Sequence, residues 1–223
     1  MKVGLIAPIK LLDKYCTTNV QYVLPSLYSE SRIYRDFYDG RGDEGDIVML
    51  DCKRIGWKRE PEDISLCVEV AYHLQPSLII LPSYMYNLTS TIEVAYRYTE
   101  EFRDIKLVGC LEGTTHKEAQ RCMRAYHGMG LNSFAVPSHM HNVLAKVDSK
   151  EVIYVENHLK AGELVGLEGI LVTSLPVRLG LQGRLLSDYF PSPPSLTFHE
   201  EEDPFPMVVE RNIKEALRYY EDK

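Results

Sequence analysis

The chain has 223 residues, lacks any long hydrophobic run and is poor in the motifs that mark metal and nucleotide sites. No stretch of about 18 apolar residues is present, which argues against a membrane span. The N-terminus, Met1–Pro8, is too short and too strand-like for a signal peptide, so we expect a cytoplasmic protein. The five cysteines form no C-x-x-C pair, and no cysteine–histidine spacing indicates zinc. We therefore expect reduced thiols, no metal and no cofactor.

Basic residues are fewer than acidic ones, 25 Lys and Arg against 32 Asp and Glu. The formal net charge of −7 argues against tight, non-specific binding to nucleic acid by this chain alone. Seven of the 32 acidic residues lie in two short segments, 60–63 and 200–203. One local basic cluster is either a rim for nucleic acid or a solvated loop: Lys53, Arg54, Lys58 and Arg59.

Short β-branched runs that stop on a polar or acidic residue are the most informative feature present. A buried parallel strand reads as a continuous apolar run, and its carboxyl end faces the ligand crevice in α/β folds. Polar groups placed repeatedly at that end predict a pocket for a small molecule or a nucleobase. The six clearest runs are Asp46–Asp51, Ser77–Ser83, Lys106–Glu112, Ser133–His139, Val152–Glu156 and Gly169–Ser174.

Strand and helix signals alternate along the chain. Helices are expected from Glu30 to Tyr38 and from Pro61, and Thr115 with Glu118 has the spacing of a helix start. Eight strand signals predict a single-domain α/β fold, a (β/α)8 TIM barrel over residues 1–190. Residues 191–223 are expected to be a Pro-rich tail and a C-terminal helix packed on the barrel. The alternative, a doubly wound open sheet, normally has a Gly-rich turn after strand one, and residues 7–10 contain no glycine.

Three acids directly end apolar runs and are the first candidates for chemistry: Asp51, Glu112 and Glu156. Buried carboxylates need partners, and paired ones serve as nucleophile and acid/base in glycosidic chemistry. They also accept N–H bonds from a purine-like ring, or they simply end strands and cap helices.

Aromatic and basic side chains are the next candidates. Tyr84 and Tyr86 are positioned to stack on a flat ring or to pack in a loop, and His139 is expected to form local hydrogen bonds rather than to bind metal. Arg178 and Arg184 follow the last strand, where barrels often bind phosphate, or they pair with the acids of the tail.

The order of several motifs resembles that of the tRNA-guanine transglycosylase superfamily. The likeness runs from about residue 20 to 184 and is greatest to the short phage and bacterial proteins that insert 7-deazaguanine bases into DNA. The motifs that carry it, in chain order, are Leu50–Lys53, Leu81–Ser83, Thr99–Phe102, Cys110–Gly113 and Val172–Pro176.

The resemblance implies a TIM barrel that exchanges a nucleobase at an N-glycosidic bond. By the resemblance, Asp51 helps to seat the base and Glu112 stands at a base-contacting glutamine position. Ser83 stands at a position where the family has an acidic residue. The position of the family's nucleophilic aspartate is occupied by Val172, which cannot attack C1′. Glu156 is then the substitute nucleophile or general base. Further residues expected to line the substrate site are Ser83, Gly113, His139, Thr173 and Ser174.

The sequence therefore predicts a pentosyltransferase acting on a nucleobase or nucleoside, in DNA or tRNA, as a homo- or heterodimer. The alternative is an inactive subunit that binds a base or nucleic acid, or that partners an active homologue. A third interpretation, an aldolase or lyase, requires a strand-end lysine for a Schiff base, and none is evident in the sequence.

Overall fold

The computed structural model describes residues 2–6, 9, 12–54, 60–140, 152–155 and 170–174. The strands are β1 (Lys2–Ile6), β2 (Val20–Val23), β3 (Ile47–Asp51), β4 (Leu78–Ile80), β5 (Leu107–Cys110), β6 (Phe134–Pro137), β7 (Val152–Val155) and β8 (Ile170–Ser174). The helices are α1 (Leu12–Tyr15), α2 (Pro25–Glu30), α3 (Arg32–Tyr38), α4 (Ile64–Leu74), α5 (Leu88–Glu101) and α6 (His116–Gly128). None of these helices is long and apolar enough to cross a membrane. The predicted tail and C-terminal helix, 191–223, lie outside the described residues.

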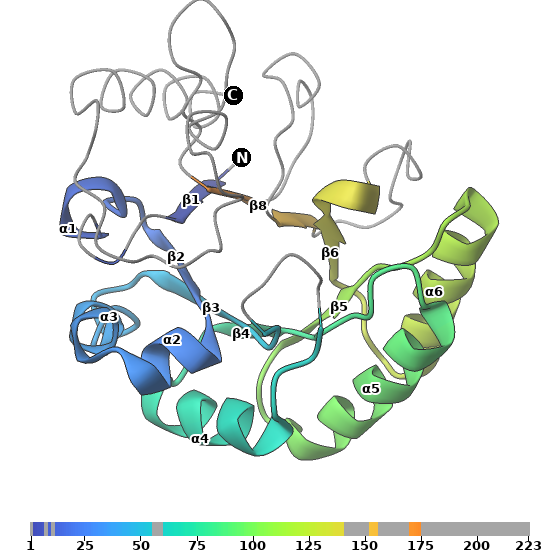
Figure 1. Cartoon of the computed structure of the whole chain (residues 1–223), viewed down its shortest axis with the longest axis horizontal. Coiled ribbons are helices and arrows are strands. Elements are labelled where there is room, and N and C mark those ends of the chain that lie inside the picture. The colour runs from blue at the N-terminus through green and yellow to red at the C-terminus, as the bar shows by residue number, and fades with distance from the viewer. Residues whose placement is uncertain are drawn as a thin grey trace, which may run out of the picture.

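All strand pairs are parallel, in the order β1-β8-β7-β6-β5-β4-β3-β2. Strands β2 to β6 curl into a half-barrel, and helices α2 to α6 lie along its outer side (Figure 1). The architecture is therefore an α/β fold built from successive strand–helix units.

The prediction of a complete (β/α)8 barrel is wrong for the part of the chain that the structure describes. Strands β1 and β2 stand at opposite ends of the strand order, with no hydrogen-bonded ladder between them in the described residues. Alternating strand and helix signals are local, and they specify parallel units. Closure depends on strand tilt and register around the whole sheet, which no local pattern encodes.

Short polar side chains decide where the helices begin. The helix predicted from Glu30 to Tyr38 is divided, because the Ser31 hydroxyl accepts a hydrogen bond from the Tyr34 backbone N–H (3.2 Å) and starts α3. Helix α4 begins at Ile64 rather than Pro61, because Asp63 is its N-cap and accepts from the Ser65 N–H (2.8 Å).

The helix-facing and concave faces of the sheet can be told apart at Gly109. A Cβ at Gly109 would lie 2.5 Å from the Tyr126 ring of α6, so this position faces the helices. Side chains alternate along a strand, and therefore Val108 faces the concave side. The register pairs Val108 with Ile80 and Ile80 with Asp51, which places Asp51 on the concave side as well.

All five cysteines are buried thiols. Burial raises the pKa of Cys122 to about 12 and holds that of Cys52 well above its usual range. Since the thiolate is the reactive form, we expect the thiols of the folded chain to resist DTNB at mildly alkaline pH. All five cysteines should react with DTNB once guanidinium unfolds the chain. Rapid labelling of even one thiol in the folded protein would contradict this packing.

Candidate functional site

Four polar side chains follow neighbouring parallel strands at the edge of the sheet where the strands end. Asp51 is the last residue of β3, and Ser83, Glu112 and His139 come shortly after β4, β5 and β6. Because the strands are parallel, these residues belong to one edge, which is where α/β sheets place their ligands.

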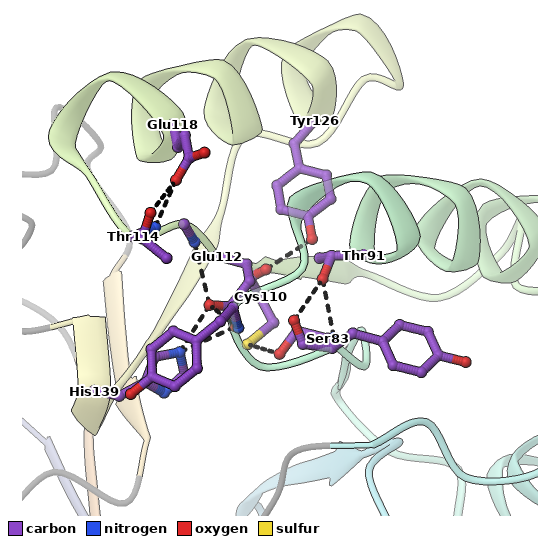
Figure 2. A network of polar contacts seen from close by, with 11 residues as sticks. Ser83, Thr91, Cys110, Glu112, Thr114, Glu118, Tyr126 and His139 are labelled. Atoms are coloured by element: carbon purple, nitrogen blue, oxygen red, sulfur yellow. Dashed lines mark hydrogen bonds and ion pairs between the residues drawn. The ribbon is translucent and has the colours of Figure 1, made fainter.

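Glu112 and His139 form a buried pair at this edge (Figure 2). His139 Nε2 lies 2.9 Å from Oε1 and 3.0 Å from Oε2 of Glu112. The Glu112 side chain is 0% exposed and that of His139 is 11% exposed, so the imidazole is the member of the pair that solvent reaches. The carboxylate therefore holds the more exposed histidine in place by direct contact.

Two backbone N–H groups complete the surroundings of Glu112. Oε1 accepts hydrogen bonds from the N–H of Tyr86 and from the N–H of Gly113, each 3.1 Å long. Charge-assisted bonds of this kind offset the cost of burying a carboxylate. Two loops, the one after β4 and the one after β5, are thereby fixed to one side chain.

The turn after Glu112 requires glycine. Gly113 has φ +149°, and a Cβ there would lie 2.8 Å from Glu118 Cβ and 2.9 Å from the Ala119 backbone nitrogen. The start of α6 is therefore packed directly against this turn. Thr115 caps α6 by accepting from the Glu118 N–H (3.2 Å), as the sequence spacing predicted. Hydrogen bonds from the Thr114 hydroxyl and backbone lower the pKa of Glu118.

The geometry also defines the protonation of His139. A carboxylate only accepts hydrogen bonds, so Nε2, which lies against both oxygens, carries a proton. In the neutral imidazole the second nitrogen, Nδ1, is then an acceptor. No described residue forms a hydrogen bond with Nδ1. The pair can therefore take a proton at Nδ1, and the carboxylate stabilises the imidazolium that results.

Residues around the pair form further hydrogen bonds. The buried Ser83 hydroxyl donates to Cys110 Sγ (3.4 Å), and the Tyr126 hydroxyl donates to the Cys110 carbonyl (2.7 Å; Figure 2). Burial holds the pKa of Tyr126 well above its usual range, so this phenol keeps its proton. Tyr84 is partly exposed, and its backbone is tied to the Thr91 hydroxyl (2.9 Å from the Tyr84 N–H).

Asp51 belongs to a second buried pair. The Tyr22 hydroxyl donates to Asp51 Oδ2, and both side chains are buried. Tyr22 pairs in register with Met49, two residues before Asp51, so it shares the concave face. Sequence reasoning missed Tyr22, although its place in the mostly apolar run Val20–Val23 was the available signal.

Lys53 was also missed, because its charge suggested a basic loop. Its side chain is only 1% exposed, and its backbone pairs with Pro61 in an antiparallel bridge just beyond β3. A buried lysine therefore lies two residues beyond the end of β3. Its position two residues after the buried Asp51 was the signal that could have identified it.

Of the other predicted site residues, two are described by their backbone pairing and three lie outside the described residues. Thr173 and Ser174 lie in β8, where the backbone pairs them with Leu5 and Ile6 of β1. Glu156, Arg178 and Arg184 lie outside the described residues. In the described part of the chain, no group of three or more His, Cys, Asp and Glu side chains is placed to hold a metal ion.

Comparison of the chain with protein-family models and with curated proteins gives no match. Any assignment of function therefore depends on the geometry of the carboxyl edge and on the order of the sequence motifs.

Proposed function

We propose that the chain acts on the N-glycosidic bond of a nucleobase, in a nucleoside, in DNA or in tRNA, and that Glu112 and His139 are the centre of its site. The observation that carries the proposal is the buried carboxylate–imidazole pair at the carboxyl edge of the sheet. Asp51, on the concave face near the same edge, supports it as a second buried carboxylate, which accepts a hydrogen bond from the Tyr22 hydroxyl. The motif order resembling guanine transglycosylases points to the same bond.

His139 has the role of moving the proton in this reaction. The attacking group, a water or an incoming base, gives its proton to Nδ1 as it bonds to C1′. The C1′–N bond breaks, and its electron pair goes to the leaving base, which takes a proton back from the imidazolium. In the covalent form of the reaction, Glu156 bonds to C1′ first and the base leaves as its anion with the electron pair of the C1′–N bond. The incoming water or base then displaces Glu156 and gives its proton to Nδ1, from which the departed base takes it. Glu112 keeps the imidazole in the productive tautomer throughout.

Incorporation of labelled guanine into duplex DNA and bulk tRNA, together with release of guanine from nucleosides, tests this proposal. We expect turnover by the wild-type chain and a loss of about 10²-fold or more in Asp51→Asn and in His139→Ala. Asp39→Asn is the matched control, since Asp39 also accepts a tyrosine hydroxyl, from Tyr28, but follows the outer helix α3. Wild-type turnover in both site variants, or none by the wild type on any of these substrates, would overturn the proposal.

A second function, binding a base without exchanging it, is favoured by one observation. Ser83 stands where the resembled family has an acid, and its buried hydroxyl is engaged with Cys110 Sγ. A base that binds the purified chain with no exchange or release, alone or with an active homologue, would support this role as a binding subunit.

A further inference from the structure

We propose that Tyr86 is the recognition platform of this site and selects a flat heteroaromatic ring, which it stacks beside His139. The inference rests on the proposed function and adds to it the group that recognises the substrate. It assigns the affinity for the base to an exposed aromatic ring rather than to the buried carboxylates.

The first observation is the position of the ring. The Tyr86 and His139 ring centroids are 5.3 Å apart in an edge-on arrangement, with 73° between the ring planes. Tyr86 is nevertheless 59% exposed. An edge-on contact covers little of the ring, so much of the Tyr86 ring remains open beside the imidazole.

The second observation is the backbone that holds the ring there. Tyr86 has φ +61°, which is uncommon for a bulky residue that is not glycine. Its N–H donates to Glu112 Oε1 (3.1 Å), the same oxygen that His139 contacts. The carboxylate therefore positions the tyrosine and the histidine together. Its hydrogen bond to the Tyr86 N–H helps to hold the unfavourable φ, which places the tyrosine ring beside His139.

The chemistry of the surface defines the ligand class. An aromatic face offers stacking to any nucleobase, and the neighbouring Nδ1 acceptor favours a ring that carries an in-plane N–H. Sugars and phosphates offer neither feature. Guanine-type bases offer both.

Binding of guanosine, followed by ligand-observed NMR, tests the platform, with ribose 5-phosphate as the non-aromatic comparison. We expect Tyr86→Asn to raise the Kd for guanosine about tenfold. Asparagine tolerates the left-handed backbone, so this variant removes the ring without adding strain. Tyr86→Phe, which keeps the ring, should bind within about twofold of the wild type. Tyr96→Asn is the matched control, because Tyr96 is 60% exposed on α5.

The outcomes separate this inference from the proposed function. Guanosine binding that weakens in Tyr86→Asn but not in Tyr96→Asn supports the platform, even if no base is exchanged. Equal affinity in Tyr86→Asn and the wild type overturns it, even if exchange occurs. Absence of guanosine binding by the wild type, or equal binding of ribose 5-phosphate, also overturns it.

Discussion

Replacing Glu112 with glutamine is expected to lower the rate of base exchange by about 10²- to 10⁴-fold while the fold survives. Glutamine keeps a carbonyl oxygen for the N–H groups of Tyr86 and Gly113, which are each 3.1 Å from Oε1. Its amide would then face His139 Nε2 as a donor. The imidazole would turn to the other tautomer, with the proton on Nδ1, and it would lose its proton acceptor.

Glu118→Gln is the control for this variant. Glu118 is a carboxylate six residues further along that accepts bonds from Thr114 at the exposed start of α6. Exchange rates measured at saturating base should be unchanged in Glu118→Gln, with circular dichroism confirming that both variants are folded. Exchange at the wild-type rate by Glu112→Gln would show that the pair does not handle the proton.

The second large effect is on stability. Gly109→Ala should lower the free energy of unfolding by about 2–4 kcal/mol, because overpacking costs about 1–3 kcal/mol and a lost hydrogen bond about 1 more. The new Cβ would lie 2.5 to 2.9 Å from three ring atoms of the buried Tyr126. Moving that ring strains the bond from its hydroxyl to the Cys110 carbonyl (2.7 Å).

Gly128→Ala, in the same strand–helix unit, is expected to raise the free energy of unfolding instead. Gly128 ends α6, and a Cβ there meets no atom within 4 Å. Removing the flexibility of a helical glycine should stabilise the chain by about 0.5–1 kcal/mol. Urea unfolding at constant m-value measures both changes. If Gly109→Ala unfolded at the wild-type midpoint, the packing of α6 on β5 would be wrong.

The local parts of the half-barrel could be predicted because their causes are local. The apolar run Val152–Val155 is strand β7 as predicted, and Thr115 caps α6 through its own side chain. Asp51 and Glu112 were identified as buried strand-end acids for the same reason, since burial of the strand extends to the residue that ends it.

Contacts between distant segments could not be read from the sequence. The partner of Glu112 is 27 residues away, and the Tyr86 N–H that it accepts is 26 residues away. No spacing rule links such positions, so the sequence did not predict that Glu112 pairs with His139. The burial of Lys53 was not predicted for a related reason, because its charge suggested only a basic rim or a solvated loop.

The tautomer that Glu112 imposes on His139 is central to the proposed reaction, and NMR of the side-chain nitrogens of the ¹⁵N-histidine-labelled protein measures it directly. We predict that neutral His139 carries its proton on Nε2, and that adding guanosine shifts its ring signals. His127, whose Nδ1 lies 3.1 Å from the Asn132 amide oxygen on the exposed end of α6, should not respond. A proton on Nδ1 of His139, or ring signals that ignore the ligand while guanosine binds elsewhere, would contradict the role proposed for the pair.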